Sequence, residues 1–252
     1  MEIIFNKVNN NISFNIDKCD IYSFLGDSKS IKSLIGEYIN KPKLCKIGKI
    51  NISKDIKIGY VSNNPYDNFK NKTVKELLTF VLKKHKYKLN KINTRINEVL
   101  DIVNLDKKYI NEIDNNLDYV NAKKLSFACI LIYNPNVIIL DNYTECLDYN
   151  DRKELIRLLR ILKNRYNKTI ILITKDSSFC YEIGSYIYLV NNETIVKKGK
   201  YDILKNTSLV NRLNLRVPEI IKFIKEYKKY SEEVENYNNI LDLIKAIYRD
   251  IG

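Results

Sequence analysis

The chain has 252 residues, 45% hydrophobic and 29% charged, with a formal net charge of +13, which suits one large or two small globular domains. Its five cysteines are scattered, odd in number and never spaced as Cys-x-x-Cys. With no signal peptide, this pattern favours a reducing cytosol over a disulfide framework or a zinc site. The single histidine, His85, nearly excludes histidine-based triads, and no apolar run reaches the ~18 residues of a membrane-spanning helix.

The positive charge alone would permit binding to nucleic acid or to anionic lipid. However, the lysines are spread through a chain that is rich in Lys, Asn and Ile and contains 19 Tyr and no Trp. Such a bias is typical of an AT-rich coding sequence. We therefore interpret the charge as compositional and expect no nucleic-acid partner.

The first predicted elements are short strands at residues 2–8, 12–16 and 20–25, the last of which leads into Gly26. A polar loop follows, and apolar residues then recur at helical spacing from position 31 to position 39. A strand, a lysine-containing loop and a helix form the context of a phosphate-binding loop. Lys32 and Ser33 fit its Lys-Ser/Thr pair, but Ile31 stands where the pattern requires glycine, so the match is partial.

Strands and three amphipathic helices are predicted next. Thr73 is the expected N-cap of the first helix, because Glu76 completes a capping box three residues later. Apolar residues that recur on one face predict the other two helices. The predicted elements are strands at 50–52 and 56–61 and helices at 74–84, 92–105 and 122–133, the last after a polar break at 115–121.

The stretch from Asn134 to Asp148 contains the strand around which the chain is organised. Val137 to Leu140 form an apolar run too brief for a helix, bounded by Pro135 and Asp141. This is typical of a strand buried on both faces of a parallel sheet. An aspartate at its carboxyl end would lie where open α/β sheets bind ligands and could hold Mg²⁺ beside a phosphate. The alternative is a core strand that ends in a capping aspartate.

The remaining pattern completes an α/β chain that we interpret as one domain, residues 1–252. A helical insertion is expected at about residues 66–134 and a helical C-terminal region at about residues 201–252. The elements predicted after Asp148 are a helix at 151–163, a strand at 169–174, a hairpin of 187–190 and 194–197 around Asn191-Asn192, and helices from residue 202 onward, one of them starting at Pro218.

The order of these segments resembles that of the ATP-binding cassette (ABC) ATPases, from about residue 12 to residue 200. The matching segments are the phosphate loop (26–33), GYVSNNP at the Q-loop (59–65), LDYVN at the signature (117–121), VIILDN at Walker B (137–142), ECLD at the D-loop (145–148) and TIILITKD at the switch (169–176). Within that family, residues 59–69, TVKELLTF and residues 209–227 most resemble the ATPase subunits of energy-coupling factor (ECF) importers. The resemblance implies a P-loop NTPase fold of the ABC type, with a RecA-like parallel-sheet core, an N-terminal antiparallel β part, an inserted helical subdomain and a helical C-terminal tail.

The resemblance also implies a site for ATP with Mg²⁺. Ser33 and Asp141 would bind the metal, and Asp148 matches the D-loop aspartate. The nucleotide would contact the phosphate loop and the Q-loop position, which comprise Gly26, Asp27, Ser28, Lys29, Ser30, Ile31, Lys32, Ser33 and Asn63.

The residues that perform catalysis in the family are replaced here. Asn142 occupies the general-base position, and an amide can orient a water but cannot accept its proton. Lys175 occupies the switch-histidine position, and Asp118-Tyr119-Val120 replaces the signature Ser-Gly-Gly with a carboxylate and bulky side chains. Further replacements are Lys29 and Ile31 for loop glycines and Asn63 for the Q-loop glutamine. We therefore expect weak ATP binding and slow or absent hydrolysis, with no catalytic residue intact, and whether the chain is an enzyme stays open.

By the same resemblance, we expect a cytoplasmic subunit, peripheral on the inner face of the cell membrane. It would dimerise with another ABC ATPase subunit, identical or different, and bind an integral membrane transporter subunit. The loop with Pro65, Tyr66 and Phe69 would form part of the docking surface. One alternative is a structural or regulatory pseudo-ATPase that acts through protein contacts without nucleotide. Another, a soluble ABC protein on nucleic acid, is disfavoured because the chain carries a single cassette.

Overall fold

The computed structural model describes residues 3–8, 12–17, 19–26, 38–39, 41–46, 48–53, 56–87, 91–191, 194–227, 243–245 and 248. The loop residues 27–33, most of the helix expected after them and the turn residue Asn192 lie outside this set. The predictions made for those residues therefore stay predictions.

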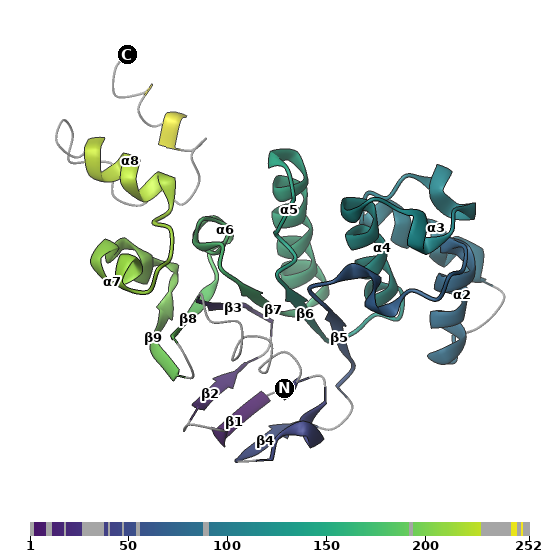
Figure 1. Ribbon diagram of the computed structural model, residues 1–252, viewed down its shortest axis with the longest axis horizontal. Coiled ribbons are helices and arrows are strands. Elements are labelled where there is room, and N and C mark those ends of the chain that lie inside the picture. The colour runs from purple at the N-terminus through teal and green to yellow at the C-terminus, as the bar shows by residue number, and fades with distance from the viewer. Residues whose placement is uncertain are drawn as a thin grey trace.

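A six-stranded sheet in the order β5-β6-β7-β3-β8-β9 forms the centre of the described molecule (Figure 1). The first five strands in that order are parallel, and β9 pairs antiparallel with β8 at the edge. The bounds are β3 Ile21–Leu25, β5 Ile58–Val61, β6 Val137–Asp141, β7 Thr169–Thr174, β8 Tyr186–Asn191 and β9 Thr194–Lys200. A second, antiparallel sheet has the order β2-β1-β4 and consists of β1 Ile3–Val8, β2 Ile12–Ile16 and β4 Lys49–Ile52.

The alternation of side chains along the central strands assigns each face of the large sheet to a different layer. Ile138 and Leu140 of β6 pack in the same cluster as the helices, whereas Val137 and Ile139 pack with the antiparallel sheet. All five residues of β6 are buried, which confirms the prediction of a strand covered on both faces.

Most helices lie on one side of the sheet, and the segment between β5 and β6 forms a group of its own beyond β5 (Figure 1). That group comprises α2 Val74–Lys84, α3 Ile92–Ile102 and α4 Tyr119–Leu131, with short 3₁₀ turns at Pro65–Asn68, Lys107–Asn111 and Asp114–Asn116. The later helices are α5 Tyr149–Tyr166, α6 Ser177–Ile183, α7 Thr207–Arg212 and α8 Glu219–Tyr227, with 3₁₀ turns at Tyr201–Lys205 and, earlier in the chain, at Pro42–Leu44. Among the described residues, none of these helices combines the length and the apolar character needed to cross a membrane.

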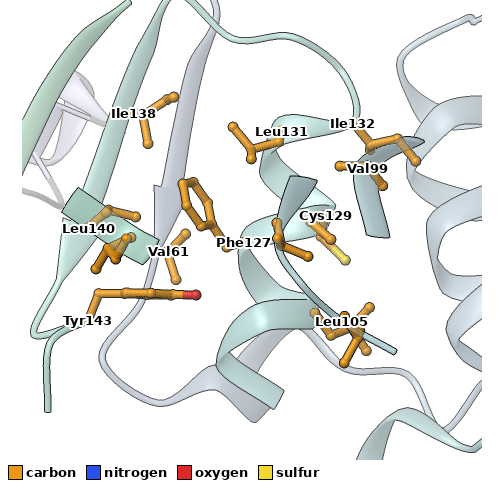
Figure 2. Packing of buried hydrophobic residues seen from close by; sticks show 14 of the residues in the cluster. Val61, Val99, Leu105, Phe127, Cys129, Leu131, Ile132, Ile138, Leu140 and Tyr143 are labelled. Atoms are coloured by element: carbon orange, nitrogen blue, oxygen red, sulfur yellow. The ribbon is translucent and has the colours of Figure 1, made fainter. Parts of the chain in front are cut away.

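Helix α4 attaches the inserted helices to the sheet. Phe127 and Leu131 lie toward Ile138 and Leu140 of β6 (Figure 2), and all four side chains are buried. Gly59 of β5 permits this approach, because a Cβ there would lie 2.0 Å from Ile130 Cγ2. At about 25 cal/mol per Å² of apolar surface, burial of this kind is the main favourable term in holding the insertion on the core.

Two helices begin earlier than the periodicity predicts, and in both cases an aspartate cap explains the difference. Asp118 Oδ1 accepts from Asn121 N at 3.0 Å, so α4 starts at Tyr119 rather than at residue 122. Asp148 Oδ1 accepts from Asp151 N at 2.8 Å, so α5 starts at Tyr149 rather than at residue 151. A capping side chain satisfies N–H groups that the first turn cannot.

Candidate nucleotide-binding site

Three parallel strands, β3, β6 and β7, end side by side at one edge of the sheet. Gly26 N, just after β3, donates to Thr174 O of β7 at 3.3 Å, and Asn142 N, just after β6, donates to Ile173 O at 2.7 Å. These bonds bring Gly26, Asp141 and Thr174 to the carboxyl edge, where open α/β sheets bind ligands. Of the predicted nucleotide-binding residues, Gly26 and Asn63 are described, and Asp27 to Ser33 lie outside the described residues.

Gly26 is required by a close approach of the backbone. A Cβ at this position would lie 2.1 Å from the carbonyl oxygen of Val190 in β8. Every other residue type would therefore displace β8 or the start of the loop. The glycine that opens the predicted phosphate loop thus has a packing role in addition to any contact with phosphate.

Asp141 is almost fully buried, with 3% of its surface exposed, and its Oδ2 accepts from Tyr60 Oη at 2.9 Å. A carboxylate at this edge is the kind of donor that Mg²⁺ prefers, and magnesium in nucleotide sites is held by only one or two carboxylates beside the phosphates. Asp141 therefore fits a metal carried in by a nucleotide. Within the described residues, no cluster of three or more His, Cys, Asp or Glu side chains could hold a metal by itself.

Asn142 follows Asp141 in a left-handed conformation, with φ of 47°. Its Oδ1 is buried, and within the described part of the chain no donor is bonded to it. An amide oxygen in this position can accept a hydrogen bond from a water molecule. It cannot remove a proton from that water, because an amide has no basic site in the range where a carboxylate works.

A network of polar side chains surrounds the end of β7, and the predicted switch position next to it is a lysine. Thr174 Oγ1 accepts from Asp176 N at 3.0 Å and lies 3.3 Å from Thr144 Oγ1. Asp176 also forms an ion pair with Arg152 of α5 and caps α6 through Phe179 N at 2.9 Å. Lys175, at the predicted switch position, is exposed at this edge.

The predicted signature segment begins α4 with a negative charge. Asp118 caps the helix and also accepts from Asn121 Nδ2 at 2.6 Å. The hydrogen bond from the Asn121 backbone N–H holds the pKa of the Asp118 carboxyl below its usual value, so the group is ionised at neutral pH. A helix N-terminus otherwise attracts anions, and a carboxylate cap opposes that attraction.

Tyr119 connects the predicted signature segment with the predicted Q-loop. Its Oη donates to Asn63 O at 3.4 Å, and its ring lies 4.8 Å from Lys123 Nζ. Asn63 is exposed. The structure therefore places these two segments, 56 residues apart in sequence, next to each other.

Lys123 is a residue of this region that the sequence pattern did not single out. It is 2% exposed, and its Nζ donates to three backbone carbonyls: those of Asn142 at 3.2 Å, Tyr143 at 3.1 Å and Glu145 at 2.6 Å. Burial lowers the pKa of its ammonium group. The available signal was a lysine inside a helix whose other positions are apolar nearly all round, which is the pattern of a buried helix.

Comparison with known proteins places the chain in a family. No protein-family model matches it. The energy-coupling factor transporter ATP-binding protein EcfA1 of Staphylococcus aureus strain USA300 is 31% identical over 245 residues, which cover 92% of this chain and 89% of that protein. The same protein from strain N315 is 30% identical over the same coverage. The chain belongs to the ECF transporter ATP-binding proteins.

Solved structures agree on the fold. The structure of cbiO1 from Clostridium perfringens, part of the ABC transporter complex cbiONQ, aligns with this chain at a TM-score of 0.71 and 19% identity. The alignment covers 88% of this chain and 98% of that chain. A dimeric ATP-binding cassette in a post-hydrolysis state with ADP and Pi has a TM-score of 0.71 and 20% identity, covering 79% and 98%. The predicted P-loop NTPase fold of the ABC type is confirmed.

One expectation for this ECF family member needs correction. Pro65 and Phe69 were expected on a docking surface, but both are buried, Phe69 with 9% of its surface exposed. Tyr66 is half-buried, stacks edge-on against Phe69 and donates to Leu117 O at 2.9 Å. The aromatic residues thus attach the loop to α4, and the exposed part of the loop is polar.

Proposed function

We propose that the chain is the nucleotide-binding subunit of an ECF-type ABC transporter, that it binds ATP with Mg²⁺ weakly, and that it hydrolyses ATP slowly or not at all. Membership of the ECF transporter ATP-binding proteins supports the transporter assignment. The placement of Asp141 and Gly26 together at the carboxyl edge supports a site for a metal-bound nucleotide.

The observation that carries the proposal of slow hydrolysis is the amide of Asn142. It stands directly after Asp141, with a buried Oδ1 and no basic group. General-base assistance typically contributes 10²–10⁴-fold to a rate, and this contribution is absent from an amide. Mg²⁺, when bound, would neutralise charge on the phosphates, but it would not replace the proton acceptor.

Asp118 supports the same proposal, because in a pair of cassettes it would face the nucleotide bound to the partner. Head-to-tail pairing of two cassettes would bring the N-terminus of α4 to a nucleotide on the partner. The ionised Asp118 would then face a γ-phosphate of like charge, which opposes the electrostatic stabilisation on which phosphoryl transfer depends. We therefore propose that the partner is a second cassette, together with a membrane subunit at the inner face of the membrane.

The test is steady-state phosphate release from the purified chain with Mg²⁺ and ATP. We expect a rate no faster than that of a Lys32→Ala control, because proton removal falls to solvent. Turnover near 1 s⁻¹ or faster, about the lower end of typical enzyme rates, would contradict the proposal if Lys32→Ala abolished it.

Restoring single groups sharpens the test. Asn142→Glu alone should stay at background, since catalytic groups that act as a unit do not add independently. A variant that combines Asn142→Glu with Ile31→Gly, Asp118→Ser, Tyr119→Gly and Val120→Gly should release phosphate faster than background.

Equilibrium binding of a fluorescent ATP analogue separates the two functional hypotheses. Saturable binding that Lys32→Ala weakens supports the transporter subunit, and absence of binding supports a pseudo-ATPase that acts through protein contacts alone.

A further inference from the structure

A groove of about 450 Å³ lies between α3 and α5, at the edge of the sheet opposite the candidate nucleotide site. Two residues that line it are Pro135, two positions before β6, and Lys168, directly before β7, so the groove is at the amino ends of these strands. Its volume falls within the range of small-molecule sites.

One end of the groove holds a buried cation with a single neutral partner. Lys168 is 8% exposed, and its Nζ donates to Asn134 Oδ1 at 2.6 Å. Among the described residues this Nζ has no other hydrogen bond or ion pair, although an ammonium group has three N–H donors. Burial, and then the charges of Arg95 and Lys57, lower the pKa of this ammonium group. A buried charge normally has a counter-ion, and none is present here among the residues described.

The other charged residues of the groove do not supply that counter-ion. Asp101 pairs with Lys107 at 2.8 Å, and Glu154 accepts from Asn104 at 2.6 Å. Both acids lie near the far end of α3, where its last turn approaches α5.

Arginines also line the groove. Arg95 is held by two carbonyls at the end of α4, Ile132 O at 3.3 Å and Leu131 O at 3.4 Å, and pairs with Glu98 at 3.2 Å. Arg157 also lines the groove, but it is exposed and lies one turn from Glu154 on α5. Arg95 is thus matched by Glu98, and the unmatched positive charge at this end of the groove is that of Lys168 itself.

The walls between the two ends are mainly apolar. On α5 the residues that face the groove recur at helical spacing, with Leu158, Ile161 and Leu162 on one stripe. Leu131 of α4 and the ring of Tyr166 complete the apolar surface. A ligand that fits must combine an apolar body with one negative charge.

We propose that this groove binds a small amphiphilic carboxylate, with the carboxylate on Lys168 Nζ and the apolar body along Leu158 and Ile161. A monoanion matches the one positive charge of Lys168. Its oxygens can accept hydrogen bonds from the two remaining N–H groups of the Lys168 ammonium. The bound molecule would contact both α3, which belongs to the inserted helices, and α5, which belongs to the core.

The experiment is isothermal titration of the purified full chain with decanoate, below its micelle concentration, and with decanol as the uncharged analogue. We expect saturable one-to-one binding of decanoate and at least tenfold weaker binding of decanol. Lys168→Met should weaken decanoate at least tenfold, whereas Lys168→Arg, which keeps the charge, should stay within threefold of the wild type. Leu158→Trp, which fills the groove, should weaken both ligands.

The matched control is Lys83→Met, an exposed lysine on α2, which should leave decanoate binding unchanged. Circular dichroism checks that each variant is folded, and Lys168→Arg remains informative if Lys168→Met is not. Non-saturable uptake, equal binding of decanol, or equal affinity of Lys168→Met and the wild type would overturn the proposal. ATP should not displace decanoate, because the two sites lie at opposite edges of the sheet, so this result is independent of the outcome at the nucleotide site.

Discussion

Two of the lysines that the structure describes, Lys123 and Lys168, are buried but differ in how their hydrogen-bonding capacity is used. Lys123, at the carboxyl edge, donates to three backbone carbonyls. Lys168, at the amino edge, donates to one side-chain amide. Burial lowers the pKa of both ammonium groups. The difference shows that burial alone does not reveal the role of a charge: the first lysine is saturated and holds a loop together, whereas the second has donors left for a ligand.

The largest expected effect comes from Lys123→Met, which keeps the length of the side chain and removes its donors. The carbonyls of Tyr143 and Glu145 would lose the Lys123 partner, whereas Asn142 O would keep its bond from Glu145 N at 3.2 Å, and buried unsatisfied acceptors cost about 1–3 kcal/mol each. Because the bond to Glu145 O is only partly buried, we expect the free energy of unfolding to fall by about 2–4 kcal/mol. Urea denaturation followed by circular dichroism measures it.

The matched control for that experiment is Lys153→Met, in the first half of α5, whose ammonium group stacks on the Tyr149 ring 4.1 Å away. A surface contact of this kind is worth about 0.5–1 kcal/mol. If Lys123→Met changed stability no more than Lys153→Met does, the three hydrogen bonds would not be stabilising the loop.

A smaller effect is expected from the same substitution at the other buried lysine. Lys168→Met leaves one unpaired acceptor, Asn134 Oδ1, on a residue that is exposed and can bond to water instead. It also removes a buried charge that lacks a counter-ion. These effects oppose each other, so the free energy of unfolding should change by less than about 1 kcal/mol. A loss as large as that of Lys123→Met would mean that Lys168 is as fully bonded as Lys123.

The smallest effect is a dependence on pH. The pKa of Lys168 is lowered in the folded state from its ordinary value of 10.5, so between the folded and the ordinary value the unfolded chain binds more protons. Stability of the wild type should therefore rise with pH across that alkaline window, because the penalty for burying the charge is relieved. Urea denaturation at several pH values gives the free energy of unfolding of the wild type and of Lys168→Met. Taking the difference between the two removes the contribution of titrating groups that both proteins share. A difference that moves in the other direction would contradict the lowered pKa.

Much of the fold could be predicted because local signals agreed with the tertiary structure. Val137 to Leu140 are apolar and β-branched enough to specify a doubly covered strand, and the capping box of Thr73 and Glu76 forms as expected, with Glu76 N donating to Thr73 Oγ1 at 3.2 Å. The placement of Asp141 at the strand end followed from parallel topology alone. In these segments, propensity, periodicity and capping point to the same structure.

The sequence pattern failed where a side chain acts over a distance that no local signal encodes. The apolar character of α4 indicates that Lys123 is buried, but nothing in the local sequence identifies its partners, which lie 19 to 22 residues away in a loop. Lys168 lies in the loop before β7, where a lysine is expected to be exposed, and its burial depends on how α3 and α5 approach each other. Phe69 was expected at the surface because its neighbours are polar, but only the contact with Tyr66 and the helices determines which way its ring faces.

The saturated lysine at the carboxyl edge also has a mechanical consequence. Lys123 is one turn into α4, and Asp118 caps the same helix, so the hydrogen bonds of Lys123 connect the segment from Asn142 to Glu145 with the first turns of α4. A rotation of the inserted helices relative to the sheet must either break these bonds or carry the segment along. A displacement of α4 would therefore be transmitted through the hydrogen bonds of Lys123 directly to Asn142, at the end of β6, without involving the sheet.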